Sequence, residues 1–268
     1  MLSDLIPEWA HIRRPVIGML HAPPLPGAPR CSSEMRGITQ FVLRDAETLI
    51  RGGVNGLLLE NFGDAPFARR RVSAGTVAAL TTLATAVRSR FDVPFGINVL
   101  RNDALSALAI AVAVDAAFIR VNVLTGARLT DQGIIQGNAH TLLRERSRLR
   151  ADRIRIFADV NVKHSVALGV ERPIEEEAAE TVQRGGADGL IVSGVGTGRP
   201  ADVAELRRVK QAGGATPVVV GSGLDPESAA AYAADADGFI VGTGLKRDGV
   251  VTNPVDEGRV AALLALLA

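Results

Sequence analysis

Cysteine and lysine are both scarce in this sequence of 268 residues. Cys31 is the single cysteine, so neither an intramolecular disulfide nor a zinc site made of several cysteines can form within the chain. Lys163, Lys210 and Lys246 are the only lysines among 30 basic residues, and the rest are arginines. A lysine near a predicted functional site is therefore easy to notice.

An excess of charge of either sign is also missing. Lys and Arg together number 30 and Asp and Glu number 29, which gives a formal net charge of +1 at pH 7. A global basic surplus of the kind that attracts nucleic acid is absent, so we expect no nucleic-acid partner.

Long hydrophobic runs are absent as well, although hydrophobic residues make up 47% of the chain. No apolar stretch approaches the ~20 residues of a membrane-spanning helix. The segment 1–14 carries Asp4, Glu8 and Trp9 and lacks the basic-then-apolar order of a signal peptide. We therefore expect a folded cytoplasmic protein with a large core and no membrane span.

Short apolar runs alternate with Ala-rich helical stretches along the chain. Strands are predicted at Val16–Leu20, Gly56–Glu60, Phe95–Val99, Ala117–Asn122, Arg155–Val160, Gly189–Ser193, Pro217–Gly221 and Gly238–Gly242. Helices are predicted at Ile38–Arg51, Gly75–Arg90, Ala104–Val114, Gly137–Leu149, Ile174–Arg184, Asp202–Gln211, Pro226–Ala233 and Val255–Leu267. Eight strand–helix units predict a single α/β domain, a (β/α)8 TIM barrel over residues 15–268 with a short N-terminal arm over 1–14. An open doubly wound sheet is the alternative, but no Gly-x-Gly-x-x-Gly follows the first strand.

A weak internal repeat supports this organisation. The segment Arg51–Leu59 resembles Arg184–Val192, and Ala236–Val241 resembles the second half of both. A glycine that ends a helix and a second small residue before the next strand explain the pattern locally. The segment Ala22–Pro29 is rich in proline and follows the first strand, where we interpret it as a stiff loop.

Polar residues gather where the predicted strands end, which is the face of a TIM barrel that carries active sites. Candidate catalytic residues are Lys163, Asp159, Glu60, His21 and His164. Candidate substrate-binding residues are Asn61, Asn98, Arg120, Asn122, Asn161 and Ser193. Polar side chains within apolar strands are costly unless they are paired or solvated, so their convergence on one rim indicates a site.

The segment after Arg155–Val160 is the most suggestive part of this rim. Asp159, Asn161 and Lys163 alternate, so we expect them to share one inward face. Lys163 could form a Schiff base, hold an anion or act as an acid, and an ion pair with Asp159 or Glu60 that braces the barrel is the alternative. His11 and His140 are interpreted as surface or packing residues.

Glycines follow the last three predicted strands in pairs. Candidate phosphate-binding residues are Gly194, Gly221, Ser222, Gly223, Gly242, Thr243 and Gly244. Gly-x-Gly loops after the seventh and eighth strands that open helix N-termini are the usual phosphate site of barrels, because backbone N–H groups point at the anion. The alternative is that these glycines only close tight turns.

Four of these candidates are of residue types that bind metals: Glu60, Asp159, His21 and His164. No spacing places two of them on one helix, and we expect no metal and no other cofactor.

Two long segments follow predicted strands. In Phe62–Arg71, three arginines either grip an anionic substrate or form a solvated charge run. Val123–Gly137 is expected to be a mobile lid.

Several of these segments together resemble the BtpA/SgcQ family. They are Gly18–His21 with the proline-rich loop, Glu60–Phe67, Asn98–Asp103, Phe118–Asn122, Asp131–Gly137, Asp159–His164, Val219–Gly223, Lys246–Asp248 and Asn253–Asp256. The resemblance covers nearly the whole chain, and Glu60–Phe67 is a specific block. It implies a ribulose-phosphate-binding type of barrel. The family takes its name from a role in photosystem I biogenesis in cyanobacteria, and other members accompany sugar-transport genes.

These observations predict an enzyme that acts on a small phosphorylated compound, a phosphosugar or a phosphoribosyl compound. The reaction expected is an isomerisation, a carbon–carbon lyase step or a glycosidic cleavage, with Lys163 and Asp159 handling protons and Glu60 as the alternative base. The alternative function is that of a non-catalytic assembly or regulatory factor, which would show an apolar surface near Trp9 and an empty rim. We expect a homo-oligomer in either case.

Overall fold

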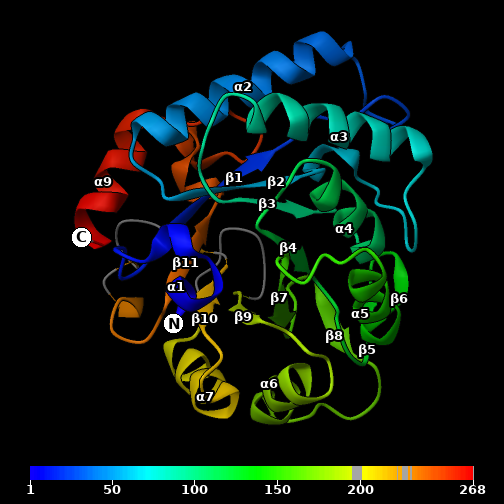
Figure 1. The fold of residues 1–268 in the computed structure, drawn as a ribbon, viewed down its shortest axis with the longest axis vertical. Helices are drawn as coiled ribbons and strands as arrows, with labels where there is room; N and C mark the ends of the chain where they lie inside the picture. Colours follow the sequence, from blue (N-terminus) through cyan, green and yellow to red (C-terminus); the bar gives the residue numbers. More distant parts are fainter. Residues whose placement is uncertain (195–200, 222, 225–228, 230, 268) are drawn as a thin grey trace.

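A closed barrel of parallel strands forms the centre of the computed structural model, which describes residues 1–194, 201–221, 223–224, 229 and 231–267. The strand order around the barrel is β1-β11-β10-β9-β7-β4-β3-β2 (Figure 1). The strands are β1 (Val16–His21), β2 (Gly56–Glu60), β3 (Phe95–Asn98), β4 (Phe118–Val121), β7 (Arg155–Val160), β9 (Gly189–Val192), β10 (Val218–Val220) and β11 (Gly238–Val241). Each lies on a predicted strand, so the (β/α)8 barrel is confirmed and the open sheet is wrong.

Helices surround the barrel and cover its outer face (Figure 1). They are α2 (Met35–Arg51), α3 (Ala74–Arg88), α4 (Ala104–Ala113), α5 (Ala139–Arg148), α6 (Ile174–Gln183), α7 (Val203–Gly213) and α9 (Glu257–Leu267). Side chains at the starts of α3, α4 and α7 cap free backbone N–H groups: Ser73, Asp103 and Asp202 each accept a hydrogen bond from the first turn. Half of the helix predicted over Pro226–Ala233, residues 226–228 and 230, falls outside the described residues.

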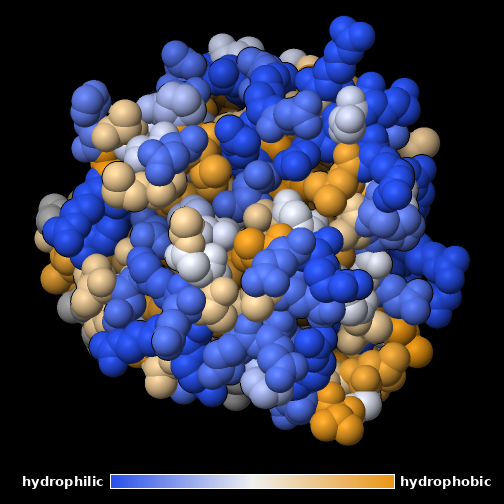
Figure 2. All heavy atoms as spheres, turned by 60° about the horizontal axis from the view of Figure 1, so that its bottom comes forward, coloured by the Kyte–Doolittle hydropathy of each residue, from blue (hydrophilic) through white to orange (hydrophobic). Residues whose placement is uncertain are grey.

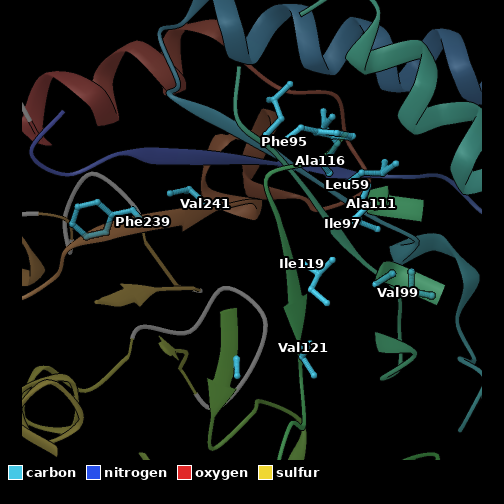
Figure 3. Packing of buried hydrophobic residues seen from close by; sticks show 14 of the residues in the cluster. Leu59, Phe95, Ile97, Val99, Ala111, Ala116, Ile119, Val121, Phe239 and Val241 are labelled. Atoms are coloured by element: carbon cyan, nitrogen blue, oxygen red, sulfur yellow. The ribbon is translucent and has the colours of Figure 1, made fainter. Parts of the chain in front are cut away.

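The main hydrophobic core lies between the strands and the helices. Outward-facing strand residues such as Leu59, Ile97 and Ile119 pack there, together with Ala111 of α4 (Figure 3). Both faces of the strands are buried because the barrel interior is filled too, which explains why the strands are continuous apolar runs in the sequence.

The N-terminal arm fills the end of the barrel where the strands begin. It consists of α1 (Leu2–Leu5) and the 3-10 helix η1 (Pro7–Trp9), and in Figure 1 α1 lies over β10 and β11. Leu2, Ile6 and Trp9 are buried in one cluster with inward-facing residues of the strands. The Trp9 indole N–H donates to the Asn55 carbonyl at 2.8 Å, so the polar atom of this buried ring is paired.

A second, smaller sheet lies beside the barrel and was not expected from the sequence. It has the order β6-β5-β8, with β5 (Ala127–Thr130), β6 (Gly133–Gln136) and β8 (Ser165–Ala167) all antiparallel. Most of the segment Val123–Gly137, which was expected to be a mobile lid, forms the β5–β6 hairpin. Its movement over the pocket stays a prediction. Gly133 has φ +90° directly after the two-residue turn, a conformation that glycine adopts without strain.

One lysine is completely buried away from the rim. Lys246 lies between the short helices η3 (Thr243–Leu245) and η4 (Arg247–Gly249), and its Nζ donates to Asp45 Oδ2 of α2 at 2.5 Å. Asp45 Oδ1 also accepts a hydrogen bond from the Val255 N–H at 2.9 Å. The pair therefore fastens segment 246–255, which follows β11, to α2.

Hydrophilic side chains cover most of the face shown in Figure 2, where hydrophobic residues form only small groups. Within the described part of the chain, no helix has both the length and the hydrophobicity needed to cross a membrane.

Candidate active site

The alternation of strand residues carries polar side chains into the upper barrel. Met19, Leu58, Phe118, Phe157 and Ile191 belong to the inner apolar cluster. Because every second residue of a strand points to the same face, the residues two positions later also point inward. These are His21, Glu60, Arg120, Asp159 and Ser193, all buried or nearly so. The interior thus changes from apolar to polar toward the C-terminal ends of the strands.

An Arg120–Asp159 ion pair is the centre of this polar layer. Arg120 donates from Nε to Asp159 Oδ2 at 3.0 Å and from Nη2 to Oδ1 at 2.7 Å. Asn122 Nδ2 and Ser193 Oγ also donate to the same carboxylate, at 2.8 and 3.2 Å. With four hydrogen bonds accepted, Asp159 is held as a fixed anion that orients Arg120.

Asn98 of β3 and Asn122, which directly follows β4, brace this pair. Asn98 Nδ2 donates to the Arg120 carbonyl at 3.1 Å and to Asn122 Oδ1 at 3.2 Å. Asn98 Oδ1 is a buried acceptor that has no hydrogen-bond partner among the described residues.

Glu60, Lys163 and His21 lie around Arg120 and line a pocket with it. In the described part of the chain, neither the Glu60 carboxylate nor the Lys163 ammonium makes a hydrogen bond or a close ion pair, apart from His21 Nε2 at 3.9 Å from Glu60 Oε1. The predicted alternative of a bracing ion pair between Lys163 and Asp159 or Glu60 is therefore not what the structure contains. Both groups are available to a bound molecule.

Burial brings the pKa values of Glu60 and Lys163 closer together. Burial raises the pKa of Glu60, although Arg120 and Lys163 oppose the shift. Burial lowers the pKa of Lys163, and the nearby charge of Arg120 adds to the effect. The pKa of His21 is lowered well below its usual value by burial and then by Lys246, Lys163 and Arg120, so His21 is a neutral imidazole at pH 7. A carboxyl and an amine with converging pKa values are suited to proton transfer.

Two connected chambers make up the pocket at this end of the barrel. The larger has a volume of about 890 Å³ and the smaller about 370 Å³. Both are lined by His21, Glu60, Phe62, Arg120 and Lys163. The two chambers therefore meet at the group of side chains that carries the chemistry.

The smaller chamber is lined by the predicted glycine loops. Gly221 and Gly223 after β10, and Gly242, Thr243 and Gly244 after β11, all line it. At Gly242 a Cβ atom would lie 2.6 Å from Cε1 of His21, so a larger residue there would displace the imidazole. Gly194 is buried and lies outside the lining of both chambers. Ser222 lies outside the described residues.

Two predicted residues serve other contacts. The expectation that Asn161 faces the barrel interior is wrong, because Asn161 has φ +53° and breaks the alternation that begins in β7. Its Oδ1 accepts a hydrogen bond from Arg128 of β5, away from the pocket. Asn61 Oδ1 accepts from the Leu100 N–H at 2.7 Å and fixes the turn after β3. Asn61 therefore shapes the rim without lining the pocket.

Other predicted residues lie at the edge of the larger chamber or beyond it. His164 is exposed and lines the chamber, and burial and Lys163 lower its pKa. Arg69, Arg70 and Arg71 are exposed and line a separate hollow beside β6.

Arg101 and Asp131 are pocket residues that the sequence interpretation did not select. Arg101 is buried, lines the larger chamber and donates from Nη2 to the Lys163 carbonyl at 2.6 Å. Asp131 reaches the same chamber from the turn of the β5–β6 hairpin. Arg101 lies three residues after the end of β3, so its position after a strand was an available signal, whereas the hairpin that delivers Asp131 was not recognised.

No group of three or more His, Cys, Asp or Glu side chains within the described ranges is arranged to hold a metal ion.

Comparison with solved structures shows the same fold at low sequence identity. (S)-3-O-geranylgeranylglyceryl phosphate synthase from Thermoplasma acidophilum, in complex with its substrate sn-glycerol-1-phosphate, matches with a TM-score of 0.62 and 18% identity. The match covers 100% of this chain and 98% of the synthase.

Comparison with curated proteins gives much closer relatives. An uncharacterized protein of Thermococcus kodakarensis is 46% identical over 95% of both chains. The photosystem I biogenesis protein BtpA of Synechocystis is 44% identical over 95% of this chain and 88% of its own length. The model of the BtpA family matches residues 12–268, and the chain therefore belongs to the BtpA family.

Proposed function

We propose that this protein is an enzyme that acts on a small phosphorylated compound by general acid–base catalysis. The observation that carries the proposal is the junction of the two chambers. There the glycine loops after β10 and β11 meet Glu60, Lys163 and Arg120 within one continuous pocket. A phosphate in the smaller chamber would place the rest of the molecule against these side chains.

The smaller chamber suits a phosphate for two reasons. Glycine has no side chain to keep an anion away from the backbone, and Gly223 adopts φ +71°, as glycines in anion-binding loops often do. The cations Arg120 and Lys163 also line this chamber and favour a negative ligand. The synthase of the same fold, whose structure was solved with sn-glycerol-1-phosphate, supports the same choice of ligand.

Glu60 and Lys163 are the residues we assign to proton transfer. A raised pKa for Glu60 and a lowered pKa for Lys163 make it easier for the carboxylate to accept a proton and for the ammonium to donate one. Asp159 was expected to share this work, but its saturated hydrogen bonds favour a positioning role through Arg120. Arg120 would then stabilise negative charge that develops on the substrate. Isomerisation, carbon–carbon cleavage and glycosidic cleavage can all use a proton acceptor, a proton donor and a cation that stabilises negative charge.

A non-catalytic assembly factor is the second candidate, and the name of the Synechocystis relative supports it. That function was expected to need an apolar surface near Trp9. Trp9 is 0% exposed and belongs to the inner cluster, so the arm offers no such surface. The filled polar rim favours the enzyme. A homo-oligomer, a cytoplasmic location and the absence of a nucleic-acid partner stay predictions.

Thermal unfolding against a ligand panel tests the phosphate site. We expect inorganic phosphate and sugar phosphates to raise Tm and free sugars to leave it unchanged. A ligand at 100 times its Kd stabilises the folded state by about 2.7 kcal/mol, which is a readable shift. Failure of every phosphate ester to raise Tm would remove the phosphate site and favour the assembly factor.

Variants test the catalytic assignment once a stabilising ester is found to turn over. Glu60→Gln and Lys163→Met should each lower kcat by about 10²-fold or more. Arg70→Ala, an exposed residue outside both chambers, is the control and should keep full activity. Full turnover by the Lys163 variant would contradict the assignment.

A further inference from the structure

Phenylalanine side chains are concentrated in the larger chamber. The sequence has only 8 Phe, 1 Trp and 1 Tyr in 268 residues. Three of the phenylalanines, Phe41, Phe62 and Phe67, line this chamber. Each is partly exposed, whereas the other aromatic side chains are buried or pack against the core: Trp9, Phe91, Phe95, Phe118, Phe157, Tyr232 and Phe239. Partly exposed aromatic surface is costly in water, so three such rings at one pocket indicate a binding surface.

The elements that bring these rings together come from different parts of the chain. Ile38, Phe41 and Arg44 are three residues apart on α2, so they lie on one side of that helix. Phe62 and Phe67 belong to the loop after β2. Pro23 and Pro24 of the loop after β1 complete the apolar wall. The chamber therefore has an apolar side built by α2 and the first two loops.

Polar groups line the chamber as well. Arg101 and Asn122 are buried residues in its lining, and Asp131 reaches it from the hairpin. Arg101 has five N–H donors, and among the described residues only Nη2 finds an acceptor, the Lys163 carbonyl. A saturated acyl chain would make no hydrogen bond to Arg101, whereas a heterocycle can contact rings through its faces and polar groups through its edge.

The side chains where the two chambers meet favour a ligand whose phosphorylated part is joined to a ring. The ring centroids of His21 and Phe62 are 4.9 Å apart with their planes tilted by 55°, and both residues line both chambers. At about 890 Å³ the larger chamber lies near the upper end of the roughly 300–1,000 Å³ of small-molecule sites. A simple phosphosugar bound with its phosphate in the smaller chamber would leave most of this volume and the phenylalanine wall uncovered.

We propose that the larger chamber binds a planar heteroaromatic group that is joined to the phosphorylated sugar held at the glycine loops. This inference rests on the proposed function and narrows its substrate to nucleotide-like compounds.

Isothermal titration with inorganic phosphate, ribose 5-phosphate and the common nucleoside 5′-monophosphates tests this inference. At least one nucleotide should bind about tenfold or more tightly than ribose 5-phosphate, because only the nucleotide covers the aromatic wall. Phe67→Ala and Phe41→Ala should each reduce this advantage and leave the affinity for ribose 5-phosphate within twofold. Phe91→Ala, which removes a partly buried ring outside the pocket, is the matched control and should keep the advantage.

The outcomes separate this inference from the proposed function. If ribose 5-phosphate binds and every nucleotide binds no more tightly, the ring site is wrong and the phosphate site stands. Nucleotide binding that is unaffected in the Phe67 and Phe41 variants would also overturn the ring site. If phosphate, ribose 5-phosphate and nucleotides all fail to bind, both proposals fall.

Discussion

Arg120 and Asp159 form a two-point ion pair at the centre of the barrel, and their side chains are only 2% and 0% exposed. With so little of its side chain exposed, the guanidinium has little access to water that could replace the carboxylate. Its charge is compatible with the fold because the Asp159 carboxyl group pairs with it at two points.

Asp159→Asn should therefore destabilise the protein by about 3–5 kcal/mol, since it leaves a buried cation without its partner. Urea unfolding followed by circular dichroism measures the change. Asp115→Asn is a matched control, because Asp115 pairs with Arg153 at 2.6 Å with side chains 70% and 54% exposed. That substitution should cost less than about 1 kcal/mol. Equal effects in the two variants would contradict the importance assigned to burial.

Lys246→Met should destabilise the fold by a similar amount, about 3–5 kcal/mol, because it leaves Asp45 buried and unpaired. The matched control is Lys210→Met. Lys210 pairs with Asp237 at 2.8 Å, but its side chain is 39% exposed, so its loss should cost under about 1 kcal/mol. Limited proteolysis should also cut segment 247–255 faster in the Lys246 variant, since the pair fastens that segment to α2. An unchanged cleavage rate would argue against the fastening role.

Trp9→Ala should cost about 3–5 kcal/mol, because the indole is fully buried at the lower end of the barrel and its removal leaves a cavity. Trp9→Phe keeps much of the packing and loses only the hydrogen bond to Asn55, so it should cost distinctly less. The midpoint of chemical unfolding of the two variants checks this order. A wild-type midpoint for Trp9→Ala would mean that the arm is dispensable for stability.

Acidification should destabilise the protein through His21. The pKa of His21 is lowered in the folded state, so the neutral form is favoured there. Its contribution to stability is complete above the ordinary value of 6.5 and is lost as the pH falls through the lower folded pKa. Glu60 acts in the opposite direction, since its raised pKa favours folding when the carboxyl is protonated.

Comparing wild type with His21→Gln isolates the histidine, because Glu60 is common to both. Unfolding free energies measured at pH 7.5 and 5 should fall less in the variant than in the wild type. His140→Gln, an exposed change on α5, serves as the control and should behave as wild type does. A variant that loses as much stability on acidification as the wild type would contradict the assignment to His21.

The strands of the barrel could be predicted because burial on both faces requires a short run of apolar residues, and such runs recur at regular spacing in the sequence. Glu60, Arg120 and Asp159 were found for the same reason, since each is a polar residue in such a run. Asn161 was misplaced because alternation was extended beyond the end of β7, where one left-handed residue reverses the direction of the side chain.

Three other features depend on contacts between distant parts of the chain, which no local sequence pattern indicates. Strand β8 is three residues long and is defined by pairing with β5, about 35 positions earlier in the chain. The Lys246–Asp45 pair joins residues 201 positions apart, so nothing near Lys246 in the sequence distinguishes it from a lysine on the rim. The phenylalanine wall is likewise assembled from α2 and a separate loop.

The position of the N-terminal arm has a kinetic consequence. Leu2, Ile6 and Trp9 close the end of the barrel opposite the two chambers. A small molecule that reaches Lys163 must therefore leave by the mouth through which it entered. For the enzyme proposed above, product that still occupies the pocket excludes the next substrate, so the product should inhibit competitively in steady-state assays.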